Sequence, residues 1–305
     1  MSKILLSVSF LLLSVSCGVI SDRQLASIGK LSAGADSLSN TPRILLRNIA
    51  EIRKERSILF SASLSDPELI TEQLQQTAEQ YLRDTSFADK ASLITDILSS
   101  YLRSLRSLSS PNRWKQTGTE LRSAGKHIDK AIANYNEIEF SRYIIHEGYA
   151  DKYSELAARL SESYLKIQQK KVIKEMVTVS DTLVASCCDA AILLLKSQEI
   201  DSLIHHEQIA VKREFKAMIS GASYTPVRLG VQDYRNYVDL ILQADRLGKN
   251  RQRCVSAFRT LKNAHQRLLK SLQKDSGIEV EDIIEEIIYI NKLTNEIYNL
   301  HDGLK

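Results

Sequence analysis

A heptad pattern of apolar residues near the end of the chain constrains its fold more than any other feature. From Tyr237 to Leu272, alternating steps of three and four residues land on eleven positions, nine of them apolar or aromatic. These positions are Tyr237, Leu240, Ala244, Leu247, Arg251, Cys254, Phe258, Leu261, His265, Leu268 and Leu272. A pattern sustained this long predicts one helix roughly 60 Å long, at about 1.5 Å per residue. Such a helix gains most of its stability by packing its apolar stripe against partner helices.

A second apolar stripe follows on Val280, Ile283, Ile287, Ile290, Thr294 and Ile297. Only a short break at residues 275–277 separates the two stripes. We therefore expect an antiparallel helical hairpin over about residues 230–300, and we expect it to be the stability core of the fold. Arg251 and His265 are the least apolar positions of the first stripe, and a buried charge there needs a partner.

Helix signals recur along the rest of the chain. Only 11 Gly and 4 Pro occur in 305 residues, and each Pro follows a Thr, Asp or Ser that can cap a helix. The pairs predict helix starts at Thr41-Pro42, Asp66-Pro67, Ser110-Pro111 and Thr225-Pro226. For the last of these, Gly230 is an alternative start.

Apolar periodicity extends these starts into whole helices. The predicted helices cover residues 42–59, 67–83, 87–109, 114–145 and 173–194, with a break near Gly148 and a loop at 221–225. Strand-like alternation never extends beyond a few residues. The sequence therefore predicts an all-α fold, an elongated bundle of long antiparallel helices with coiled-coil-like packing, over residues 41–305.

The N-terminus has the composition of an export signal. Lys3 precedes an uncharged apolar stretch, residues 4–16, that is shorter than the roughly 20 apolar residues a membrane-spanning helix needs. The following run, Leu13-Ser14-Val15-Ser16-Cys17, resembles the lipobox of bacterial lipoprotein precursors. The resemblance implies that residues 1–16 are a signal peptide and that Cys17 becomes the acylated first residue. The alternative is an ordinary small-x-small cleavage site in which Cys17 is incidental.

The resemblance also implies a location. The residue after the cysteine is Gly18 and not Asp. In Gram-negative cells, lipoproteins without an Asp at this position tend to be transported to the outer membrane. Several acyl chains hold a protein firmly on its membrane, whereas one chain holds it only marginally. Residues 17–40, rich in Ser, Gly and Ala, are then expected to form a flexible tether. A short amphipathic turn around Leu25, Ile28 and Leu31 is the alternative.

Charge and hydropathy exclude some classes of partner. Lys and Arg total 41 against 37 Asp and Glu, and the two signs are interspersed, so we expect no nucleic-acid interface. Residues 176–195 form the most apolar later stretch, but Asp181 and Asp189 interrupt it, so we expect a buried helix there. The basic run from Arg43 to Arg56 is expected to be a solvated helix face, with contact to anionic membrane as the alternative.

Three cysteines remain after Cys17, namely Cys187, Cys188 and Cys254. Neighbouring cysteines rarely bridge each other, so a bond from Cys254 to Cys187 or Cys188 is the one plausible disulfide. The alternative is three buried thiols that pack as small apolar residues. The sequence leaves both open.

The residues able to bind metals form no strong pattern. The six histidines are His127, His146, His205, His206, His265 and His301, and none has a Glu three residues before it, as di-metal bundles require. Adjacent residues such as His205 and His206 diverge around a helix, and His265 is expected to be packed and hydrogen-bonded. The acidic residues from Glu279 to Glu286 suit a helix N-terminus, with a cation site as the alternative.

The sequence supports a binding role more than catalysis. We expect no catalytic, cofactor or metal site, because no known catalytic motif is present. The leading hypothesis is a non-enzymatic cell-envelope lipoprotein, a helical scaffold or protein-binding module whose partners are its membrane and another envelope protein. A membrane-active protein similar to long-helix pore formers is the second hypothesis. An enzyme with scattered catalytic residues is the third.

Overall fold

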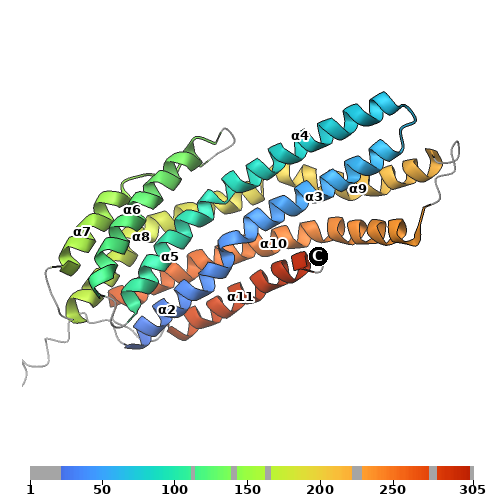
Figure 1. Ribbon diagram of the computed structural model, residues 1–305. Helices are drawn as coiled ribbons and strands as arrows, with labels where there is room; N and C mark the ends of the chain where they lie inside the picture. The colour runs from blue at the N-terminus through green and yellow to red at the C-terminus, as the bar shows by residue number, and fades with distance from the viewer. Residues whose placement is uncertain are drawn as a thin grey trace, which may run out of the picture.

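The structure, a computed structural model, describes residues 22–110, 114–138, 143–161, 166–221, 229–274 and 280–302. Across these ranges the chain is helical and contains no strand, which confirms the all-α class. The elements are α2 (Asp22–Asp36), the 3-10 helix η2 (Ser37–Asn40), α3 (Thr41–Ala62), α4 (Pro67–Ala91), α5 (Leu93–Ser109), α6 (Trp114–Asn136), α7 (Tyr149–Ser161), α8 (Lys166–Leu195), α9 (Gln198–Gly221), α10 (Val231–Lys274) and α11 (Val280–Asp302). The long helices lie lengthwise along an elongated bundle (Figure 1).

Helix α10 runs through the bundle and carries the predicted apolar stripe. Nine of the eleven stripe residues are buried, and Tyr237 and Arg251 are half-buried. Arg253 pairs with Glu296 at 2.8 Å, so α11 packs alongside α10. Arg267, later in α10, reaches the start of α11, so the two helices run in opposite directions. Coiled-coil-like packing along the bundle stays a prediction.

Helix α2 shows that the flexible tether predicted for residues 17–40 is wrong over residues 22–40. Ile28 and Leu31, two residues of the alternative amphipathic turn, are fully buried in the main core, and the structure has a whole helix here instead of a turn. Gln24 donates from its side-chain amide to the carbonyl oxygen of Ser271, at 3.2 Å. Residues 1–21, which include the predicted signal peptide and the predicted lipid site Cys17, lie outside the described residues.

The small residues of α2 have a packing role. A Cβ at Gly34 would collide with the Ile287 side chain, because α2 lies close against α11 at this point. A Ser-, Gly- and Ala-rich composition therefore reflects close helix approach in this segment. The same composition would suit a flexible linker, which is why the sequence was misleading here.

The helix predicted over residues 114–145 is shorter in the structure, because α6 ends at Asn136. The Asn136 side chain bonds both the N–H and the carbonyl of Ile145, at 3.1 and 2.8 Å, and so returns the chain toward α6. Gly148 then adopts a φ of +105°, which favours glycine. Asp129 accepts backbone N–H bonds from residues 148–150 and thereby caps α7.

Two other boundaries differ from the prediction. Helix α4 continues to Ala91, and the break before α5 falls at Ser92 instead of between residues 83 and 87. Asp66 caps α4 as predicted, accepting from the Glu68 N–H at 2.9 Å. Asn40, not Thr41, occupies the N-cap position of α3.

The remaining two proline pairs lie partly or wholly outside the residues that the structure describes. The proline of Ser110-Pro111 and both residues of Thr225-Pro226 lie outside the described residues, as does most of the loop predicted at 221–225. Helix α10 begins at Val231, directly after Gly230, which was the alternative start.

Candidate ligand-binding site

The histidine of the α10 stripe is buried and hydrogen-bonded through both ring nitrogens. The Tyr101 hydroxyl on α5 lies 2.7 Å from His265 Nε2, and Asp181 Oδ1 on α8 lies 3.1 Å from His265 Nδ1. Because a carboxylate only accepts, Nδ1 donates to Asp181, and Nε2 shares the second hydrogen bond with the tyrosine hydroxyl. Burial raises the pKa of Tyr101 well above its usual value. The prediction of a packed, hydrogen-bonded histidine is confirmed, and its role is to join three helices inside the core.

Of the sequence His205-His206-Glu207, only His206 and Glu207 meet, with His206 Nδ1 3.3 Å from Glu207 Oε1. Glu207 is buried and accepts from Arg56 Nε at 2.7 Å, with Arg53 Nε 4.0 Å away, whereas both histidines are exposed. Glu207 therefore fastens α9 to α3. Within the ranges that the structure describes, no group of three or more His, Cys, Asp or Glu side chains could hold a metal ion.

The three cysteines outside the N-terminus are free thiols, and all three are buried. The structure therefore forms no bond from Cys254 to Cys187 or Cys188. Burial raises the pKa of Cys254 to about 12, so its thiol stays protonated at neutral pH. These cysteines pack as small apolar residues, the second of the two possibilities that the sequence left open.

An apolar pocket of about 540 Å³ lies where α4, α8 and α9 meet the end of α6. Its main apolar walls are the side chains of Phe87, Tyr135, Leu193, Leu194, Ile200 and Leu203. Binding sites for small molecules measure about 300–1,000 Å³ and are mostly apolar, with a few polar groups that fix orientation. The pocket has this size and character.

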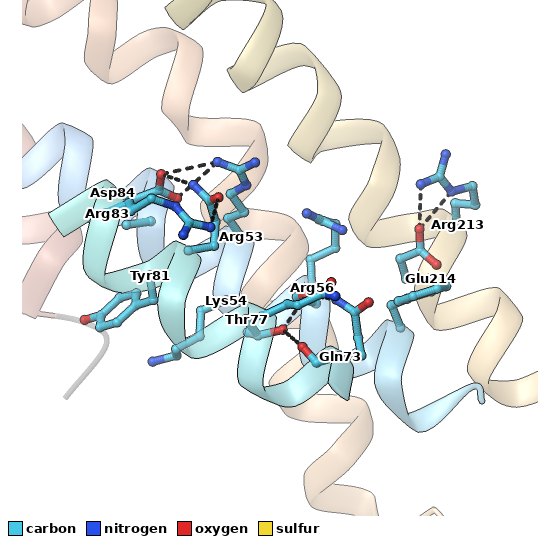
Figure 2. A pocket seen from close by; sticks show the side chains of 15 residues that line it. Arg53, Lys54, Arg56, Gln73, Thr77, Tyr81, Arg83, Asp84, Arg213 and Glu214 are labelled. Carbon is cyan, nitrogen blue, oxygen red and sulfur yellow. Dashed lines mark hydrogen bonds and ion pairs between the residues drawn. The ribbon is translucent and has the colours of Figure 1, made fainter. Parts of the chain in front are cut away.

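A second, polar pocket of about 440 Å³ lies between α3, α4 and α9. Five basic side chains line it, namely Arg53, Lys54, Arg56, Arg83 and Arg213, against two acidic ones, Asp84 and Glu214. Amides and hydroxyls from Gln73, Gln76, Thr77 and Gln80 complete the polar wall. Figure 2 shows Arg53, Arg83 and Asp84 grouped at one side, with Arg213 and Glu214 on the other.

Four residues line both pockets, so the two cavities adjoin. These residues are Arg53, Gln80, Arg83 and Asp84. Arg53 Nη1 lies 3.2 Å from Asp84 Oδ2, and Gln80 donates to Asp84 Oδ1 at 2.6 Å. Arg83 donates to Gln80 Oε1 at 2.9 Å. We call the two adjoining cavities together the amphipathic groove, with an apolar end and a basic end that these four side chains separate.

Helix α4 walls both ends of the groove and is held mainly by polar contacts. Only Thr77, Ala88 and Ala91 are buried along its 25 residues. Thr77 shares a 2.8 Å hydrogen bond with Ser57 on α3. Tyr81 donates to Glu51, also on α3. Polar, solvent-accessible contacts hold a helix less firmly than a buried apolar face, so we expect α4 to open more readily than the other walls of the groove.

The same polar contacts lower the pKa of the Glu51 carboxyl. Burial opposes its charge, but hydrogen bonds from Lys54 and Tyr81 outweigh this and lower the pKa of the Glu51 carboxyl on balance. Glu51 therefore stays ionised at neutral pH and can hold both partners. This carboxylate links α3 to α4 beside the basic end of the groove.

The basic run from Arg43 to Arg56 has a different role from the solvated face that its sequence predicted. Arg43 and Arg47 both pair with Asp89 on α4, at 2.8 and 2.9 Å. Arg53 and Arg56, further along, reach the groove as described above. The run therefore bonds α3 to its neighbours and supplies much of the positive charge of the groove.

The sequence did not reveal the groove itself. Its residues come from α3, α4, the end of α6, α8 and α9, and each of them taken alone looks like an ordinary core or surface residue. The one usable signal was the concentration of basic side chains between Arg43 and Arg56. Comparison with family models, with curated proteins and with solved structures finds no match to this chain.

Proposed function

We propose that this chain is a non-enzymatic binding protein of a bacterial cell envelope, held on a membrane by acyl chains on Cys17. The amphipathic groove is the observation that carries the binding role, because its apolar end has the size and lining of a small-molecule site. The resemblance of residues 13–17 to a lipobox supports the anchor, and the outer membrane is the proposed location. Another envelope protein stays the expected macromolecular partner.

The lining of the groove favours binding over catalysis. Neither end contains a histidine or a cysteine among the residues that line it. Its charged side chains are largely engaged with each other, as Arg53 is with Asp84 and Arg213 with Glu214. A nucleophilic mechanism needs a nucleophile beside a general base, most often a histidine. The groove is therefore suited to holding a molecule unchanged.

Binding of a small apolar probe tests this proposal. The mature protein in lipid nanodiscs is titrated with 1-aminoanthracene, and the signal of empty nanodiscs is subtracted. Leu193→Trp puts a bulky side chain into the apolar end, where Leu193 is 42% exposed. We expect saturable binding that this variant weakens strongly. Leu242→Trp, at a 45% exposed leucine of α10 outside the groove, is the matched control and leaves binding unchanged. Non-saturable binding, or equal binding by all three proteins, refutes the proposal.

A membrane-active role is the second candidate. Within the described residues, one helical stretch, Lys170–Ser220, is long and apolar enough to cross a membrane by length and composition. Its α8 part packs against α5, α7 and α10, and Met176 and Leu183 are fully buried, as in the core helix of a bundle. Insertion would have to expose that core. Release of a trapped dye from liposomes on addition of the protein would favour this candidate over the binding protein.

A further inference from the structure

The amphipathic groove also indicates a class of ligand. We propose that it holds an amphiphile with one alkyl chain and an anionic headgroup, with the chain in the apolar end and the headgroup at Arg53 and Arg83. This inference rests on the proposed binding role and specifies its ligand.

The apolar end fits an alkyl chain. Phe87 of α4, Leu193 of α8 and Leu203 of α9 face one cavity from three helices. A polar metabolite would lose its water there and gain few hydrogen bonds, which costs free energy. An alkyl chain gains about 0.8 kcal/mol for each methylene it buries. At about 540 Å³, the cavity is within the usual range of small-molecule sites.

The junction of the two ends supplies the positive charge. Arg83 is the most available cation there, because its side chain is 62% exposed and its acidic contact, Glu79, is 3.9 Å away. Arg53 is more constrained, since it lies between Asp84 at 3.2 Å and Glu207 at 4.0 Å. A guanidinium can bond a carboxylate or a phosphate through two parallel N–H groups. Arg83 is therefore the side chain best placed to bind an anionic headgroup.

The acidic residues at the junction do not cancel this preference. Asp84 bonds Arg53 and Gln80, and Glu199 is likewise engaged in an interaction. Beyond the junction, the basic end has five basic against two acidic lining side chains. Acidic side chains outside the cavity pair with two of these cations, Glu207 with Arg56 and Glu51 with Lys54. The preference for an anionic headgroup therefore rests on Arg83, whose acidic contact, Glu79, is 3.9 Å away.

Competition with 1-aminoanthracene tests the assignment on the mature protein in nanodiscs. The competitors share a ten-carbon chain and differ in their headgroup: decyl phosphate, decanol and decyltrimethylammonium. Inorganic phosphate alone is the fourth competitor. We expect decyl phosphate to compete best, and inorganic phosphate not to displace the probe, because the chain is needed to reach the apolar end.

Two variants locate the two parts of the ligand. Arg83→Gln should weaken competition by decyl phosphate about tenfold or more and leave decanol unchanged, since it removes one charge-assisted contact. Leu193→Trp should weaken decyl phosphate and decanol together. Arg246→Gln removes an exposed arginine of α10 outside the groove and should change neither.

The outcomes separate this inference from the proposed function. If decanol or decyltrimethylammonium competes as well as decyl phosphate, and Arg83→Gln changes none of them, the anionic headgroup is wrong while the apolar site stands. If inorganic phosphate displaces the probe as well as decyl phosphate does, the ligand is a free anion and the alkyl chain is wrong. If the probe itself does not bind saturably, both the inference and the proposed function fail.

Discussion

His265 can occupy a core position in α10 because two other helices satisfy its ring nitrogens. The Tyr101 hydroxyl and the Asp181 carboxylate bond opposite sides of the imidazole, so burial leaves neither nitrogen unpaired. Arg251, the other polar position of the same stripe, is half-buried and pairs with Asp201 at 2.6 Å. Both exceptions in the apolar pattern are therefore sites where helices are bonded to each other.

Removing the imidazole should destabilise the fold. We expect His265→Leu to lower the free energy of unfolding in urea by about 1–3 kcal/mol, because the buried Tyr101 hydroxyl loses its partner. The double variant Tyr101→Phe/His265→Leu should recover part of that loss, since neither polar partner remains. His146→Leu, at an exposed position, is the control. A His265→Leu variant as stable as the wild type would contradict the bonding described here.

The hydrogen bond between His265 and Asp181 should make stability depend on pH. This bond lowers the pKa of the Asp181 carboxyl below its ordinary value. A lowered folded-state pKa stabilises the fold above the unfolded-state pKa, about 4, and this contribution is lost as the pH falls through the lower folded value. Wild type should therefore exceed Asp181→Asn in urea midpoint at neutral pH, and the gap should narrow below about pH 4. A gap that stays constant would contradict the assignment.

Acylation of Cys17 is the prediction that bears on location. Mass spectrometry of the mature protein should find Cys17 as the first residue, carrying acyl chains. Cys17→Ala should release the protein from membranes or leave an uncut precursor in fractionated cells. An unmodified first residue, or cleavage elsewhere, would remove the anchor from the proposed function and leave the groove unaffected.

At the scale of single elements, the helices with long apolar stripes or with a proline near their start were predictable, whereas α2 and the end of α6 were not. The stripes of α10 and α11 repeat many times within one helix, so occasional polar residues do not hide them. Helix α2 was missed because its small residues suit a linker as well as a close helix contact. The end of α6 was missed because Asn136 stops it through a side-chain bond to Ile145, nine residues away.

The packing of α10 should dominate stability. Leu261 is buried mid-stripe, so Leu261→Ala should leave a cavity and lower the free energy of unfolding by about 2–5 kcal/mol. The neighbouring Lys262 is unsuitable as a control position, because its ammonium bonds both carboxylate oxygens of Asp189 at 2.7 Å. Lys270→Ala, at an exposed position of the same helix, should change little. Equal urea midpoints for Leu261→Ala and Lys270→Ala would contradict the packing.

At the scale of the whole molecule, the amphipathic groove depends on segments that are far apart in the sequence. Arg53 of α3, Asp84 of α4 and Glu207 of α9 come together only in the folded bundle. Periodicity in one helix indicates which face is buried, but not which helix it meets. For this reason the sequence could indicate the fold class and several of the helices, and could not indicate the candidate site.

The small number of buried residues in α4 should be visible in exchange kinetics. Because α4 buries three of its 25 residues, we expect its backbone amides to exchange with deuterium faster than those of α10. Decyl phosphate should slow exchange in α4, since the ligand bridges this helix to α8 and α9. Hydrogen exchange with mass spectrometry measures both effects. Equal protection of α4 and α10 without ligand would contradict a readily opened wall.

The folded start of α2 limits how far the bundle can move from its membrane. Asp22 is the first residue of α2 and stands five positions after Cys17, a stretch that reaches at most about 18 Å at about 3.6 Å per residue. With acyl chains on Cys17, the start of α2 would stay within about 18 Å of the lipid surface. The protein would then search for its ligand by diffusing in two dimensions along the membrane, where amphiphiles are most concentrated.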